Sequence, residues 1–104
     1  MIDPAHLRIE TMASGHLTLV LREDASWPDF EIFAPQFLAA HGGVPIEKAD
    51  SPVERVWIVS LDGAALSLAF DDYAARFELN ARDAEGDAVL KALAAKLGLR
   101  DRST

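Results

Sequence analysis

Two residues, Asp62-Gly63, separate two runs rich in apolar residues, and no other feature of the sequence restricts the fold as much. Asp-Gly favours a two-residue type I′ turn, in which both central residues need positive φ. The run before it, 55–61, consists mainly of β-forming residues, and the run after it, 65–70, alternates large and small side chains. The sequence therefore predicts an antiparallel β-hairpin here.

Four further segments have the composition of strands. Residues 7–11 and 17–22 alternate between two kinds of side chain, which is typical of a hairpin with one buried face. A short candidate strand spans 44–48, and another spans 76–80. The turns beside these strands are predicted at Ala13-Ser14-Gly15, Asp50-Ser51-Pro52 and Asp71-Asp72-Tyr73.

Two helices are expected. The first begins after Ser26, a good N-cap residue, and ends at Gly42-Gly43. Pro35 lies in its middle, and we expect a kink there, with two short helices meeting at Pro35 as the alternative. The second helix begins after Asp83 and ends near Gly98. Its apolar stripe consists of Val89, Leu90, Leu93, Ala94 and Leu97.

The predicted element order is ββαββββα, which indicates a two-layer α+β fold. Strands that follow one another through short turns form an antiparallel sheet, and both helices are expected to pack on one face of it. We expect one domain over residues 1–104, with a frayed tail at 100–104. Half of the residues are apolar and cysteine is absent, so the core is expected to form without disulfides.

The charge of the chain narrows the choice of partners. The formal net charge is −7, which repels nucleic-acid phosphates and anionic membranes and favours a basic protein partner.

The N-terminal residues lack the basic and apolar regions of a signal peptide, and no apolar run approaches the roughly 20 residues that span a bilayer. With no cysteine, we expect a cytoplasmic protein.

No catalytic, metal or cofactor site is predicted. His6, His16 and His41 have no Asp, Glu or His at the spacing of a metal site or a catalytic triad. The acids at 83–87 resemble the start of a calcium loop, but the glycine and the last ligand are misplaced. We therefore expect the fold to need no metal or cofactor.

Two groups of residues are candidates for protein binding. The first group lies in predicted turns and short strands, where the side chains can be exposed because they are not needed to pack the core. It comprises Glu47, Asp50, Asp71, Asp72 and Tyr73. The second is a possible oligomer patch: if Trp57 faces the helices, Val56 and Ile58 face the outer side of the sheet, with Val20 and Ala69 beside them.

These features favour a small, non-enzymatic interaction module. In size and charge the chain resembles bacterial inhibitor and immunity proteins, which suggests a surface that covers a basic site on a partner. One alternative is a homodimeric structural domain that uses the outer sheet face. Another is a small enzyme or ligand-binding protein with a pocket between the helices and the sheet.

Overall fold

The computed structural model describes residues 2, 4–50 and 55–99. The predicted turn residues Ser51-Pro52 and the tail 100–104 lie outside them. The elements in chain order are a 3₁₀ turn η1 (Pro4–His6), β1 (Arg8–Thr11), β2 (Leu17–Arg22), α1 (Trp27–His41), β3 (Val44–Asp50), β4 (Arg55–Leu61), β5 (Ala64–Asp71), β6 (Arg76–Ala81) and α2 (Ala84–Lys96).

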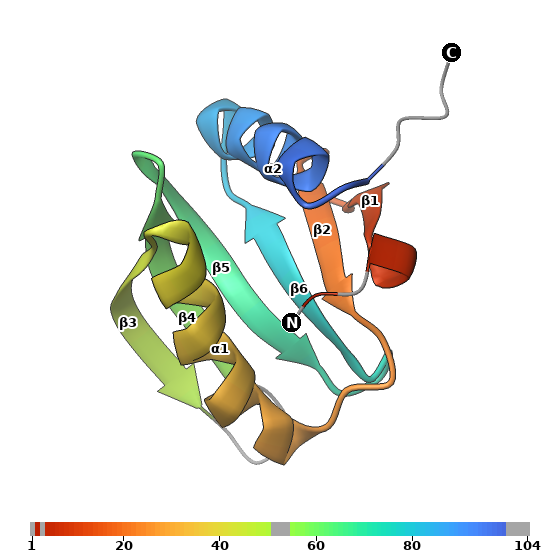
Figure 1. Ribbon diagram of the computed structural model, residues 1–104. Helices are drawn as coiled ribbons and strands as arrows, with labels where there is room; N and C mark the ends of the chain where they lie inside the picture. The colour runs from red at the N-terminus through yellow and green to blue at the C-terminus, as the bar shows by residue number, and fades with distance from the viewer. Residues whose placement is uncertain (1, 3, 51–54, 100–104) are drawn as a thin grey trace.

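The six strands form one antiparallel sheet in the order β1-β2-β6-β5-β4-β3 (Figure 1). The hairpin at Asp62-Gly63 is confirmed: Leu61 pairs with Ala64, and the two turn residues have φ of 50° and 82°. Strands β1 and β2 form one hairpin and β3 to β6 form a meander, and the last strand of the meander, β6, lies beside β2 and joins the two groups. The edge strand β3 runs to Asp50 and is longer than the predicted 44–48.

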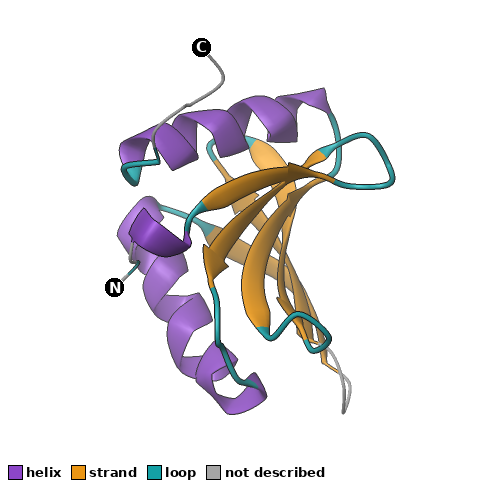
Figure 2. Ribbon diagram, turned by 90° about the vertical axis from the view of Figure 1, so that its right-hand side faces the viewer, coloured by secondary structure: helices purple, strands orange, loops and turns teal. Residues whose placement is uncertain are grey.

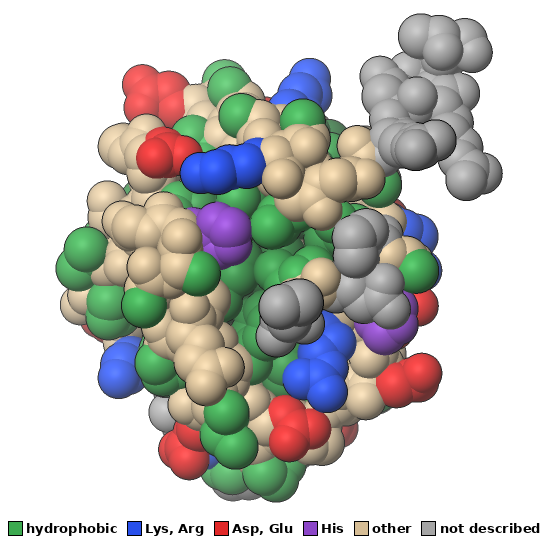
Figure 3. All heavy atoms as spheres, in the orientation of Figure 1, with side chains coloured by type: hydrophobic (Ala, Val, Ile, Leu, Met, Phe, Trp, Pro, Cys, Tyr) green, Lys and Arg blue, Asp and Glu red, His purple; other side chains and the backbone are tan. Residues whose placement is uncertain are grey.

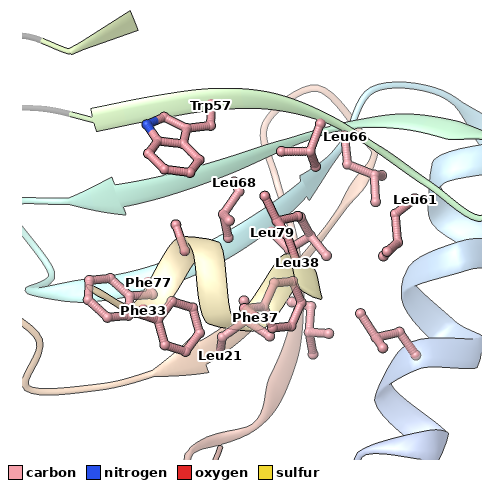
Figure 4. Packing of buried hydrophobic residues seen from close by; sticks show 14 of the residues in the cluster. Leu21, Phe33, Phe37, Leu38, Trp57, Leu61, Leu66, Leu68, Phe77 and Leu79 are labelled. Atoms are coloured by element: carbon pink, nitrogen blue, oxygen red, sulfur yellow. The ribbon is translucent and has the colours of Figure 1, made fainter. Parts of the chain in front are cut away.

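Both helices lie on the same side of the sheet, as predicted (Figures 1 and 2). Helix α1 packs against β3, β4 and β5, whereas α2 packs against β2, β5 and β6. Between the helices and the sheet lies a continuous apolar core, in which Trp57 and Leu68 point from the sheet toward Phe33 and Phe37 of α1 (Figure 4). The α+β fold of two layers is therefore confirmed.

Aromatic rings join α1 to the sheet. Phe77 of β6 is fully buried, and its ring centroid lies 4.6 Å from that of Phe33 and 5.5 Å from that of Phe30. Phe30 also meets Trp57 edge-on, with 5.4 Å between the centroids. Rings at these separations add attraction to the area that they bury. This cluster holds α1 over the β4–β6 part of the sheet.

The ends of α2 are fixed by hydrogen bonds that the sequence indicated. The Asp83 carboxylate accepts a hydrogen bond from the Gly86 N–H at 2.8 Å, as an N-cap residue does. At the other end, Gly98 has φ of 99°, and the Leu99 N–H donates to the Ala94 carbonyl at 2.9 Å. This bond and the one from Gly98 to Ala95 form a Schellman motif.

Helix α1 continues through Pro35, so the alternative of two short helices is wrong. Pro35 is exposed, and it has no N–H to donate to the carbonyl one turn earlier. Pro35→Ala is expected to stabilise the fold by about 1–3 kcal/mol, because alanine restores this donor and leaves no cavity at an exposed site. The gain is reduced by the freer unfolded chain. Urea unfolding measures the change, and a loss of stability would contradict it.

No helix in the described part of the chain has the length and apolar character needed to cross a membrane.

Candidate binding surface on the outer sheet face

Alternation along the strands places two rows of side chains on the sheet face opposite the helices. In one row, Val56 of β4 pairs with Ala69 of β5, which pairs with Glu78 of β6. In the next row, Ile58, Ser67 and Asn80 follow the same order across the three strands. Neighbours within a row lie side by side on one face because the strands are antiparallel and in register.

This outer face is hollowed. A depression of about 590 Å³ is open to solvent, and we call it the outer hollow. Its volume is within the range of ligand sites, and its lining mixes apolar and polar side chains. The lining residues are Val56, Ser67, Ala69, Phe70, Asp71, Asp72, Tyr73, Glu78 and Asn80.

The acidic residues at one end of the outer hollow form the turn between β5 and β6. One oxygen of Asp71, Oδ1, accepts hydrogen bonds from the backbone N–H groups of Tyr73 at 3.0 Å and Ala74 at 3.3 Å. This is the Asx turn that aspartate favours, and it holds the loop in shape. Asp72 and Tyr73 are exposed, and Tyr73 is the most exposed large hydrophobic side chain of the described residues.

A network of ion pairs borders the hollow on β6. The Arg76 guanidinium contacts Glu78 at 2.9 Å through Nε and Glu10 of β1 at 3.0 Å through Nη2. The hydrogen bond from Arg76 holds the pKa of Glu10 below its ordinary value. Burial alone would lower the pKa of Arg76, but its bonds to the two carboxylates raise it above the usual value. Arg76 therefore stays charged and neutralises part of the negative charge of Glu78.

Beside this network, polar contacts continue across the face. Thr18 donates a hydrogen bond to Asn80 Oδ1, and Arg8 pairs with Glu10 at 3.2 Å and also with Glu23. Val20 points to the same side of the sheet, between Arg8 of β1 and Glu78 of β6.

The outer hollow brings together residues from both predicted groups. Asp71, Asp72 and Tyr73 of the acidic group lie along it with Val56 of the apolar patch. The half-buried Ile58 lies in the adjacent row, and Glu47 is exposed on β3 opposite it. A single surface thus contains most of both groups.

Two predicted residues do not join this surface. Val20 is on the outer face but is fully buried, so the expectation of an apolar patch that includes it needs correction. Its direct neighbours on the two adjacent strands, Arg8 and Glu78, have long polar side chains, whereas alternation along a strand predicts only the direction of a side chain and not its burial. Asp50 ends β3, and its side chain lies outside the described residues.

A pair that the sequence did not reveal joins the first hairpin to α2. The Asp87 carboxylate contacts His16 Nδ1 at 2.9 Å and accepts a hydrogen bond from the Leu17 N–H at 2.8 Å. The two side chains come from positions 71 residues apart, so no local spacing could have indicated them. Of the acids at 83–87, Asp83 therefore caps α2 and Asp87 fixes the hairpin.

The hydrogen bond to His16, followed by that from Leu17, lowers the pKa of Asp87. Because the folded state lowers this pKa, ionised Asp87 stabilises the fold above its unfolded pKa, and this contribution is lost as the pH falls below about 4. Asp87→Asn should therefore be less stable than the natural protein at pH 7, with a difference that narrows toward pH 3. Urea unfolding at several pH values tests this, and a constant difference would contradict it.

The other two histidines, His6 and His41, contact neighbouring groups of the protein. His6 Nδ1 accepts a hydrogen bond from the Glu23 N–H at 3.2 Å. His41 lies against Phe37, with 4.9 Å between the ring centroids, and burial followed by the nearby Lys96 lowers its pKa. His41 and Lys96 border a second hollow of about 60 Å³ on the side that carries the helices, where apolar side chains reach the surface (Figure 3).

That second hollow is large enough for only one or two water molecules. It does not provide the ligand pocket that one alternative expected between the helices and the sheet. Among residues 2, 4–50 and 55–99, no group of three or more His, Cys, Asp or Glu side chains is arranged to hold a metal ion.

The fold and the outer hollow together define a small antiparallel α+β protein with a concave, partly acidic sheet face. Residues 7–98 match the family described as "protein of unknown function (DUF3630)", and the chain belongs to that family. Comparison with curated proteins and with solved structures finds no match.

Proposed function

We propose that this protein is a cytoplasmic, non-enzymatic interaction module that binds a basic segment of a partner protein through its outer sheet face. The observation that supports this most is the outer hollow, whose described lining contains three carboxylates and no Lys or Arg side chain. An acidic, partly apolar depression complements a cationic surface, and such complementarity steers association. The formal net charge of −7 adds to the attraction at long range.

The carboxylates around the hollow favour binding over catalysis. Asp71 fixes its own turn, and Glu78 is paired with Arg76. Each of these two carboxylates therefore has a structural role, one in a turn and one in an ion pair, that accounts for it without catalysis. Asp72 is exposed to solvent and can meet a cation without losing another contact.

The same charges argue against a homodimer on this face. Two copies related by a two-fold axis would bring the same acidic residues together, and like charges in an interface oppose association. We therefore expect a monomer in sedimentation at high protein concentration. A dimer that Val56→Glu or Ile58→Glu separates into monomers would overturn the proposal in favour of the homodimer.

Partner capture with matched variants tests the proposal. Asp71→Asn/Asp72→Lys raises the charge at the hollow by three units, and asparagine keeps an oxygen for the Asx turn. The control, Asp24→Asn/Glu85→Lys, makes the same change at exposed residues outside the hollow. Asp24 has φ of 53°, a conformation that asparagine tolerates.

The natural protein and the control should retain the same basic protein from an extract of the source cell, and the hollow variant should lose it. Retention by all three proteins, or recovery of only acidic partners, would refute an acidic binding face.

A further inference from the structure

Several carboxylate oxygens in the lining of the outer hollow accept no hydrogen bond from another described residue. Asp71 Oδ2 and both Asp72 oxygens make no hydrogen bond to another described residue, and Glu78 Oε1 has only a long contact of 3.5 Å from Asn80. The lining has fewer side-chain hydrogen-bond donors than acceptors. These donors are the amide of Asn80 and the hydroxyl groups of Ser67 and Tyr73. A ligand that suits this lining carries positive charge and several donors.

Apolar and aromatic groups lie beside these oxygens. Val56 and Ala69 are adjacent across β4 and β5, and Tyr73 is fully exposed at the turn end of the same hollow. A flat aromatic ring next to carboxylates suits a guanidinium group, which stacks on aromatic faces and bonds carboxylates with a rigid planar fork. An ammonium group is a more strongly hydrated point charge and gains less from such surroundings.

We propose that the outer hollow receives an arginine side chain of the partner. The aliphatic part of that side chain packs on Val56 and Ala69, and its guanidinium lies between Tyr73 and the carboxylates at the turn. This inference depends on the proposed function, because it names the group that an acidic binding face recognises. It goes further because it states that the outer hollow binds a guanidinium group more tightly than an ammonium group of the same charge.

Two peptides of equal charge separate charge from shape. Acetyl-Gly-Arg-Gly-Arg-Gly-Arg-amide and its counterpart with lysine each carry three positive charges, and their dissociation constants can be measured by titration calorimetry or amide chemical shifts. We expect the arginine peptide to bind about two- to fivefold more tightly, as a cation–π contact at an exposed site provides.

Two variants test whether the outer hollow is responsible for the preference for arginine over lysine. Tyr73→Ser removes the ring from an exposed turn, where the fold does not depend on it, and should abolish the preference for arginine. Ala69→Leu fills the hollow and should do the same, whereas Ala95→Leu, on the exposed side of α2, should keep the preference. Melting temperatures establish that each variant is folded.

Equal binding of the two peptides, or a preference that survives both hollow variants, would overturn the arginine inference and leave the acidic interaction module standing. If neither peptide binds even at low salt, both the inference and the proposed function fail.

Discussion

Phe77→Ala is expected to lower the free energy of unfolding by about 3–5 kcal/mol, the usual cost of truncating a buried phenylalanine. Phe77 is fully buried, and its ring lies near those of Phe30, Phe33 and Phe70. Removing it leaves a cavity between β6 and α1 and ends three aromatic contacts. The free energy of unfolding of a domain is only about 5–15 kcal/mol, so this substitution removes a large part of it.

Urea unfolding followed by tryptophan fluorescence measures this loss, because Trp57 adjoins the same cluster. Phe77→Leu is the control, and its loss should be clearly smaller because leucine fills more of the space than alanine. A loss below about 1 kcal/mol for Phe77→Ala would show that the cluster does not join the helix to the sheet in the way described.

Asp71→Asn/Asp72→Lys is expected to slow association with a basic partner by about tenfold or more at low salt, since electrostatic steering raises on-rates by factors of about 10–10³. The effect should shrink at physiological ionic strength, where the Debye length is about 8 Å. The melting temperature should change little, because the exposed Asp72 has no packing role and asparagine keeps the turn acceptor at position 71.

Surface-plasmon association rates at several salt concentrations test this second prediction. The control Asp24→Asn/Glu85→Lys alters the net charge equally but should slow association less, because steering depends most on charges near the contact. Equal slowing by the two variants would show that net charge, and not the outer face, governs the encounter.

Much of the fold follows from local patterns. Asp62-Gly63 predicted the central hairpin because only a few turn types join strands through two residues. Alternation along 55–61 places Val56 and Ile58 opposite Trp57 but does not specify which face meets the helices; the structure buries Trp57 in the core and leaves Val56 and Ile58 on the outer face. Asp83 and Gly98 indicated the ends of α2 because capping depends on nearby backbone groups.

The remaining features depend on contacts between distant segments. The pairing of β2 with β6 sets the strand order, and no local rule specifies it. The contact of His16 with Asp87 depends on how α2 packs across the hairpin. The burial of Val20 depends on the neighbouring strands on both sides of it. Strand pairing likewise assembles the outer hollow, because it places Val56 beside Ala69 and Glu78.

Mapping a cationic peptide onto the backbone amides tests the central claim of an acidic outer binding face most directly. In a titration with the arginine peptide at low salt, the largest chemical-shift changes should fall on Val56, Ser67, Ala69, Asp72 and Tyr73, and they should decrease as salt is added. Amides of α1 and α2, on the other side of the sheet, should change little. Changes centred on the helices, or spread evenly over the protein, would contradict the claim.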